Sequence, residues 1–421
     1  MGKAGACLNF LSRRSLPLPH DTPLIATIVA GLGLAFVLGL LAQRLRLPML
    51  AGYLAAGVVI GPFTPGYVAD LELAAELAEL GVILLMFGVG LHFSVKDLMS
   101  VRMIAIPGAL VQIGLATLGG MGLGLSLGWT WGASLIFGLS LSVASTVVLL
   151  RALQDRNLVQ TPQGRIAVGW LIVEDLVMVL ALVLIPPVAG LLGGESVPLE
   201  EGAEQVARLG LGPIAATLLI TLVKVSAFVA LMLVVGRRVI PALLHYTAHT
   251  GSRELFRLGV LAIALVVAFG SSYLFGVSFA LGAFFAGMVM AGSTLSQQAM
   301  KETLPLRDAF AVLFFVSVGM LFDPWVLMRS PLAVLATVGV IVGVKAVAAY
   351  GITRVFGHDR AVGFTIAASL SQIGEFSFIL ISMALALGIV PTEARDLVVA
   401  GALVSILINP LLFLALDRRS A

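Results

Sequence analysis

The sequence predicts an all-α polytopic membrane protein with about 13 transmembrane helices, arranged as an inverted repeat. Three observations predict this fold class: the composition, the number of long apolar stretches, and motifs that recur between the two halves. Of the 421 residues, 60% are hydrophobic and 11% are charged, and the mean hydropathy is +1.10. Soluble domains contain about 25% charged residues, so the composition excludes a water-soluble globule, a disordered chain and a nucleic-acid-binding domain.

The apolar stretches give the number of spans. A helix needs about 20 apolar residues to cross the roughly 30 Å hydrocarbon core of a bilayer. Thirteen stretches qualify, of which the second and the ninth are short: 23–43, 47–63, 76–93, 103–128, 132–150, 166–192, 211–236, 255–275, 278–292, 308–328, 331–353, 361–389 and 397–416. Residues 1–21 form a polar N-terminal tail before the first span.

Basic residues in the loops orient these spans. If the C-terminus faces the cytoplasm, the inside loops carry 17 of the 25 Lys and Arg residues and the outside loops carry three. An excess of Lys and Arg in cytoplasmic loops is the general rule for membrane proteins. The charges therefore predict a cytoplasmic C-terminus and an N-terminus on the opposite side.

Two pairs of motifs recur in the same order. "GYLAAGVVIG" (52–61) resembles "FALGAFFAGMVMAG" (279–292), and "LLMFGVGLHFS" (84–94) aligns with "LFFVSVGMLFD" (313–323), which pairs Gly90 with Gly319 at an offset of 229 residues. Related spans that are separated by seven crossings have opposite topology, as in the inverted repeats of many secondary transporters. We expect one repeat over 22–192, a connector helix over 211–238 and a second repeat over 252–419, within one membrane domain over 22–419.

Ionisable residues lie deep within the sixth and eleventh spans. A charge at the bilayer centre costs about 3 kcal/mol on insertion scales, so such a residue is functional by default. Glu174 and Asp175 lie mid-way along the sixth span, and Lys345 lies eight residues before the end of the eleventh, too deep to reach the interface easily. The Lys345 ammonium needs a carboxylate partner, for which Glu174 and Asp175 are the candidates.

Polar interruptions occur at corresponding places in the two halves. The twelfth span contains "SLSQIGEFSFIL", with Gln372, Gly374 and Glu375, and the fifth contains "LSLSVASTVVLL". Matching interruptions predict discontinuous helices and a binding site near the membrane midplane. The alternative is that the Ser and Thr residues satisfy their own backbone in ordinary helices, while Glu375 caps a half-helix.

Seven motifs in order resemble the Kef-type branch of the monovalent cation:proton antiporter-2 family, closest to its YbaL-like proteins, over about residues 22–419. They are "GYLAAGVVIGP", "LGVILLMFGVGL", "LSVASTVVLLRAL", "VEDLVMVL", "SFALGAFFAGMV", "LFFVSVGMLFDP" and "SQIGEFSFIL". The resemblance implies a Na+/H+ antiporter-like fold in which the two broken helices cross. It further implies a homodimer in the bacterial inner membrane, with a periplasmic N-terminus, that exchanges a monovalent cation, K+ favoured over Na+, for protons.

The resemblance also assigns roles to residues. Asp175 matches the family's ion- and proton-binding aspartate, and Lys345 matches the basic residue of the late helix, with Glu174 as its partner. We expect oxygens of Ser142, Ser145, Thr146 or freed backbone carbonyls to complete the shell of the bound cation. Neither a resident metal nor a nucleic-acid partner is expected.

The chain departs from the Kef proteins in two respects. They carry Gln-Asp where this chain has Glu174 and Asp175, which leaves the stoichiometry and the choice of ion open. They also continue into a cytoplasmic nucleotide-binding regulatory domain, whereas this chain stops after "LALDRRSA". We therefore expect no cofactor in this chain, because a nucleotide regulator would bind the absent C-terminal domain.

Two alternative functions stay open at this point. One is a ligand-gated K+ efflux channel built on the same scaffold. The other is a membrane-embedded acid–base enzyme that uses Glu174 and Asp175. Adjacent residues of a helix point about 100° apart, which disfavours a converging catalytic pair and predicts that the protein is not an enzyme.

Overall fold

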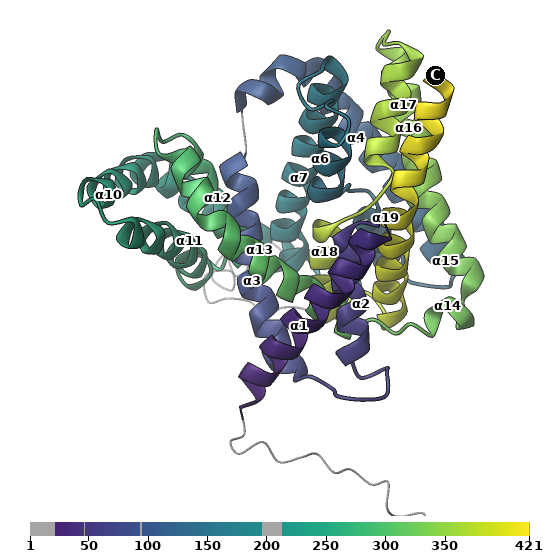
Figure 1. Cartoon of the computed structure of the whole chain (residues 1–421), viewed down its shortest axis with the longest axis horizontal. Helices are drawn as coiled ribbons and strands as arrows, with labels where there is room; N and C mark the ends of the chain where they lie inside the picture. The colour runs from purple at the N-terminus through teal and green to yellow at the C-terminus, as the bar shows by residue number, and fades with distance from the viewer. Residues whose placement is uncertain (1–21, 46, 93–94, 196–212, 421) are drawn as a thin grey trace, which may run out of the picture.

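A computed structural model describes residues 22–45, 47–92, 95–195 and 213–420, and within these ranges the chain forms helices and no strand (Figure 1). The first repeat region contains α1 (Pro23–Arg44), α2 (Met49–Ile60), α3 (Leu71–His92), α4 (Val95–Ser126), α5 (Trp131–Leu141), α6 (Thr146–Gln154) and α7 (Pro162–Val188). The connector contains α9 (Pro213–Leu231), the π-helical turn η1 (Met232–Gly236) and α10 (Arg237–His249).

The second repeat region follows the connector. It contains α11 (Arg253–Phe275), α12 (Phe279–Ala291), α13 (Ser296–Met320), α14 (Val326–Arg329), α15 (Pro331–Val338), the π-helical turn η2 (Gly339–Val344), α16 (Lys345–Val355), α17 (Arg360–Leu370), α18 (Glu375–Ala386) and α19 (Thr392–Ser420).

The helices agree with a polytopic membrane protein. Ten helices of the described chain are long and apolar enough to cross a bilayer, and the bent pair α17–α18 makes eleven. The short apolar helices α2 and α12 coincide with the two spans that the sequence predicts to be short. The connector is longer than predicted, because α9, η1 and α10 follow one another without a break from Pro213 to His249.

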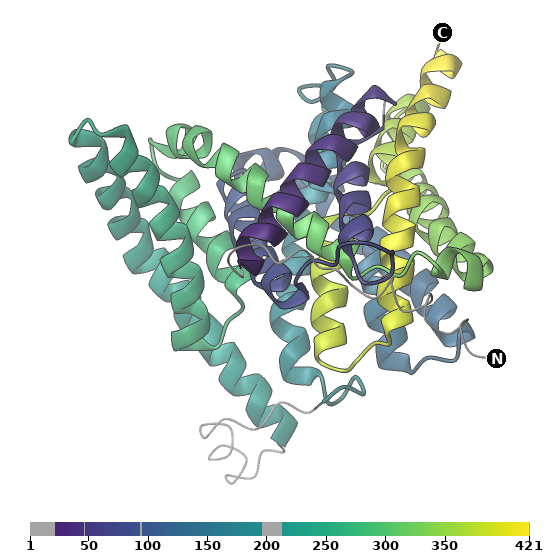
Figure 2. The same ribbon diagram turned by 60° about the horizontal axis from the view of Figure 1, so that its bottom comes forward.

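The helices pack into two bundles (Figures 1 and 2). The first, here called the scaffold bundle, consists of α1, α2, α3, α11, α12 and α13. The second, here called the core bundle, consists of α4 to α7 and α15 to α19. Contacts within each bundle are far more extensive than those between them, so the seam between the bundles is the natural plane for relative movement.

Glycines from the recurring motifs hold the scaffold bundle together. A Cβ added to Gly57 of α2 would lie 2.0 Å from the Val316 carbonyl oxygen of α13, and one added to Gly319 would lie 2.2 Å from the Leu54 carbonyl oxygen. Small residues let membrane helices approach at backbone distance, where van der Waals packing replaces the hydrophobic effect.

The second pair of motif glycines makes an equivalent contact. A Cβ on Gly90 of α3 would lie 2.2 Å from the Phe284 carbonyl oxygen of α12, and one on Gly287 would lie 2.1 Å from the Phe87 carbonyl oxygen. Each motif of the first repeat region thus packs against the non-equivalent motif of the second. The repeated sequences are therefore complementary halves of one interface.

Several basic residues lie at the end of the molecule that carries the C-terminus. Figure 1 shows the C-terminus, the α6–α7 connection and the α16–α17 connection at the same end. Arg156 lies in the α6–α7 connection, Arg165 lies near the start of α7, and Arg360 is the first residue of α17. The predicted tail (1–21) and most of the predicted outside loop with the acidic run (196–212) lie outside the described residues.

Substituting Gly90 by Leu is expected to destabilise the scaffold bundle, because the added side chain would overlap α12 backbone. Overpacking costs about 1–3 kcal/mol even where some relaxation is possible. The measurement is the melting temperature of the detergent-solubilised protein. Gly33→Leu is the control, because a Cβ there meets nothing within 4 Å. Equal melting temperatures for the two variants would contradict the close α3–α12 contact.

Candidate functional site: the crossing of two broken helices

Two interrupted helices meet at their breaks. The first interruption separates α5, which ends at Leu141, from α6, which begins at Thr146. The second separates α17, which ends at Leu370, from α18, which begins at Glu375, and bends the pair by 42°. Corresponding boundaries lie 229 residues apart, the same offset that the glycine motifs give.

Reciprocal hydrogen bonds between Ser145 and Gln372 join the two breaks. The Ser145 amide donates to Gln372 Oε1 at 2.8 Å, and Gln372 Nε2 donates to the Ser145 carbonyl at 3.2 Å. Both residues are fully buried. Because the side-chain amide bonds both backbone polar groups of one residue, it holds the crossing at a fixed register.

Gly374 lets the two breaks approach this closely. A Cβ added to Gly374 would lie 2.3 Å from Ser145 Cβ, closer than real Cβ atoms approach any other atom. Its backbone is extended, with φ at −144°, so glycine is required here by the close contact and not by its conformation.

Glu174 accepts a hydrogen bond from the backbone just before α6. The Ala144 amide donates to Glu174 Oε2 at 2.8 Å, and the Val148 amide donates to Ser145 Oγ at 3.4 Å. The N-terminus of a helix carries free N–H groups and a partial positive charge. A buried carboxylate from α7 therefore compensates this end of the half-helix.

Two side chains donate hydrogen bonds to backbone carbonyls that the breaks leave free. Lys345 Nζ donates to the Gln372 carbonyl at 2.8 Å, and Gln112 Nε2 of α4 donates to the Ser142 carbonyl, also at 2.8 Å. Both donors are fully buried. These donors balance the partial negative charge of the C-terminal helix ends.

Sequence reasoning missed Gln112 and also Asn409. Asn409 of α19 donates from Nδ2 to the Ala368 carbonyl at 2.7 Å, and its side chain is 2% exposed. A side-chain amide within an apolar span was the available signal, in "LVQIG" and "LINPL". That signal predicts a buried hydrogen bond but does not identify the carbonyl that receives it.

Three buried carboxylates surround the crossing. Thr146 Oγ1 donates to Asp175 Oδ2 at 3.3 Å, and Ser145 Oγ donates to Glu375 Oε2 at 3.2 Å. The second oxygens of Glu174 and Asp175, Oε1 and Oδ1, are buried without a hydrogen-bond partner. An unpartnered buried carboxylate oxygen is costly unless a proton or a cation joins it, so this geometry can hold either.

Lys345 and Glu174 interact through space. Each charge acts on the other, but no contact within 4.0 Å joins them among the ion pairs of the described residues. Lys345 uses its ammonium on the Gln372 carbonyl instead. The direct Glu174–Lys345 ion pair therefore stays a prediction for another state of the molecule.

The predicted shell residues differ in where their hydroxyls point. Ser145 and Thr146 direct theirs at Glu375 and Asp175. The Ser142 hydroxyl instead donates back to the Leu139 carbonyl of its own helix at 2.7 Å. Of Ser142, therefore, the backbone carbonyl is the group that bonds a neighbouring helix, through Gln112 of α4.

A cavity of about 520 Å³ lies on the seam between the bundles. The scaffold bundle contributes Tyr53, Arg307 and Asp308, and the core bundle contributes Val148 and Arg151, among others. Val148 lies two residues beyond Thr146, and Arg151 belongs to the predicted cytoplasmic side. The cavity thus approaches the crossing from that side.

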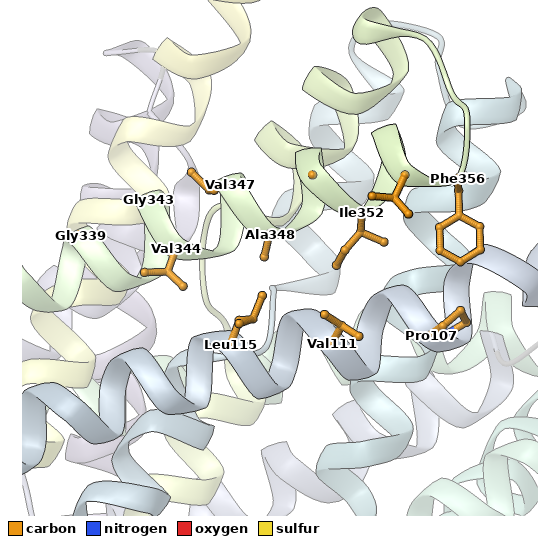
Figure 3. Close-up of a pocket in the computed structure, with 12 residues that line it drawn as sticks. Pro107, Val111, Leu115, Gly339, Gly343, Val344, Val347, Ala348, Ile352 and Phe356 are labelled. Carbon is orange, nitrogen blue, oxygen red and sulfur yellow. The ribbon is translucent and has the colours of Figure 1, made fainter.

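A larger hollow of about 830 Å³ lies between α4 and η2–α16 (Figure 3). Figure 3 shows Val111, Leu115, Val344, Ile352 and Phe356 along its walls. All the residues that line it are apolar or glycine. Because it offers no oxygen side chain, this hollow is not a cation site.

A family comparison decides what kind of protein this is. Residues 32–414 match the model described as "Sodium/hydrogen exchanger, transmembrane". The chain belongs to this family. It is therefore a multi-pass cation/proton antiporter and not an enzyme.

Individual relatives agree with this assignment. The chain is 60% identical over 399 residues to YbaL of Escherichia coli (strain K12), which is described as a cation/proton antiporter. The aligned region covers 95% of this chain and 69% of YbaL. It is 34% identical over 369 residues to K(+) efflux antiporter 4 of Arabidopsis thaliana, covering 87% of this chain and 59% of that protein.

A solved structure agrees with the fold. The sodium proton antiporter MjNhaP1 from Methanocaldococcus jannaschii matches with a TM-score of 0.68, covering 93% of this chain and 98% of MjNhaP1. The two sequences are 15% identical, so the match concerns the fold alone. It confirms the predicted Na+/H+ antiporter-like architecture.

Gly374→Ala is expected to reduce exchange by roughly tenfold or more, because the new Cβ would separate the breaks and misplace the carboxylates. The measurement is the exchange rate in proteoliposomes. Gly343→Ala in η2 is the control, because a Cβ there meets nothing within 4 Å. A wild-type rate for Gly374→Ala would show that the close crossing is dispensable.

Proposed function

We propose that this antiporter exchanges K+, in preference to Na+, for protons by alternating access, as a homodimer in the bacterial inner membrane with a cytoplasmic C-terminus. The observation that carries the proposal is Asp175, a buried carboxylate at the crossing with one oxygen held by Thr146 and the other unpartnered. The motif resemblance and the name of the Arabidopsis relative support K+.

Asp175 binds the proton and the cation in turn. When ionised, it attracts a cation, and oxygens of Thr146, Ser145 or freed carbonyls complete the shell. When it takes up a proton, its charge is lost and the cation leaves. The two ligands exclude each other because one carboxylate serves both, which couples their movements in opposite directions.

Glu174 and Lys345 tune this exchange. Glu174 holds the α6 N-terminus through Ala144, and Lys345 holds the Gln372 carbonyl. Movement of the Lys345 ammonium from that carbonyl to Glu174 would link the charge of the acidic pair to the position of α16. Coupling of this kind would connect proton uptake to cation release.

The seam between the bundles supplies the access route. The cavity beside Arg151 extends toward the crossing from the predicted cytoplasmic side as far as Val148. Rocking of the core bundle against the scaffold bundle would close this cavity and open a path on the other side. The rigid glycine contacts of the scaffold bundle favour movement of the bundles as units.

Asp175→Asn is expected to abolish cation-dependent proton movement, because an amide neither ionises nor exchanges a proton at ordinary pH. The measurement uses proteoliposomes loaded with a pH-sensitive dye, to which K+ or Na+ is added. The cation that gives the larger proton movement in the wild type identifies the preferred substrate.

The matched control for this experiment is Asp359→Asn, at an exposed aspartate that makes no side-chain cap to α17. Exchange by Asp175→Asn at the wild-type rate would refute the role of Asp175. Rapid cation flux in the wild type without proton movement would indicate a channel instead.

Lys345→Met is expected to move the pH dependence of exchange to higher pH. Without the neighbouring ammonium, the buried carboxyl groups bind protons more tightly, so a higher pH is needed to free them for the cation. The measurement is the exchange rate between pH 6 and pH 9 at saturating cation. An unchanged profile would show that Lys345 has only a structural role.

A further inference from the structure

Gln112 and Lys345 perform equivalent tasks in the two halves of the molecule. Gln112 lies on α4, the helix before the first broken pair, and Lys345 begins α16, the helix before the second. Each is fully buried, and each donates at 2.8 Å to a backbone carbonyl within the following break. The receiving carbonyls, of Ser142 and Gln372, lie 230 residues apart, one more than the repeat offset.

The equivalence is one of contact and not of identical position. The offset of 229 residues assigns Ala116, one turn beyond Gln112, to the position of Lys345. The turn η2 directly precedes Lys345. The two helices therefore reach the same type of carbonyl from neighbouring turns.

The orientation of the Gln112 amide is fixed by its neighbours. Trp170 Nε1 donates to Gln112 Oε1 at 3.2 Å, while Nε2 donates to the Ser142 carbonyl. An indole N–H is only a donor and a carbonyl is only an acceptor, so a flipped amide would lose both bonds. Trp170 is itself held against Gly108 of α4, where a Cβ would lie 2.5 Å from the ring.

The two donors differ in charge. The ammonium of Lys345 neutralises the carbonyl end at Gln372. The amide of Gln112 orients the Ser142 carbonyl and leaves its partial negative charge and a second lone pair. Lys345 is the only Lys or Arg among the buried residues of the described chain, so the break of the first repeat region holds no basic side chain of its own.

We propose that Gln112 is a positioning residue that determines cation binding: it aims the Ser142 carbonyl at the transported cation without replacing that cation's charge. The two breaks then differ in charge, because a charged donor serves one and a neutral donor serves the other. The break at Gln372 carries a tethered cation, whereas the break at Ser142, whose following half-helix brings Thr146 to Asp175, is left for the mobile one. This proposal rests on the proposed function of Asp175.

The test compares Gln112→Lys with Gln112→Met. Lysine keeps a donor for the Ser142 carbonyl and adds a charge, whereas methionine keeps the volume and removes the donor. We expect Gln112→Lys to raise the KM for the cation about tenfold or more, because a unit charge nearby opposes a second one in a low dielectric.

A purely structural role predicts the opposite order. In that case Gln112→Met would be the more impaired variant in maximal rate and in melting temperature, and Gln112→Lys would bind the cation as the wild type does. A wild-type KM for Gln112→Lys overturns the proposal. If Gln112→Lys does not fold, Gln112→Met decides: a raised KM at an unchanged maximal rate supports the proposal, and an unchanged KM overturns it.

A binding measurement separates this proposal from the proposed function. K+ or Na+ that binds the folded protein raises its melting temperature in detergent, whether or not transport occurs. Loss of that shift in Gln112→Lys supports the proposal even if the wild type shows no proton exchange. A shift of wild-type size in Gln112→Lys overturns it even if Asp175→Asn abolishes exchange.

Discussion

The need to satisfy every backbone group without water governs this molecule. Hydrocarbon offers no hydrogen bonds, so an interruption in a membrane helix is stable only where protein groups receive the freed amides and carbonyls. Here Gln372 serves both groups of Ser145, Glu174 receives the Ala144 amide, and Lys345 receives the Gln372 carbonyl. The residues that make the breaks possible are thus largely the residues to which we assign ion binding.

The two bundles divide between them the requirements of the alternating access that we propose. Backbone contact at Gly57 and Gly90 leaves the scaffold bundle little room to deform. In the core bundle, by contrast, buried polar side chains gather at the crossing, where Gly374 allows the two breaks to touch. A rigid partner and a polar centre on one moving unit let the ion site change its access while its internal geometry is kept.

Much of this could be predicted from the sequence. Apolar length located the spans, and polar interruptions located both breaks, because membranes impose strong constraints on both. The offset from Gly90 to Gly319 recurs at the helix boundaries of the breaks. The partners of Lys345, Gln112 and Asn409 could not be predicted, because contacts between distant spans depend on packing angles that a single sequence does not encode locally. Lys345 illustrates this limit. Its depth in the membrane indicates that the ammonium needs a partner, but the sequence does not show that the Gln372 carbonyl is the group it contacts in this structure.

The asymmetry of charge on a repeated backbone has a physical consequence. The repeat offset places Leu403 and Val404 where the first repeat region has Glu174 and Asp175, so the acidic pair occurs once. Lysine likewise occurs on one side of the crossing and glutamine on the other. Two equivalent breaks with equal charges would hold two equal cations or none. With an ammonium fixed at one break, a single mobile charge suffices at the other, and in the proposed mechanism that charge is a proton on Asp175 or a metal cation beside it.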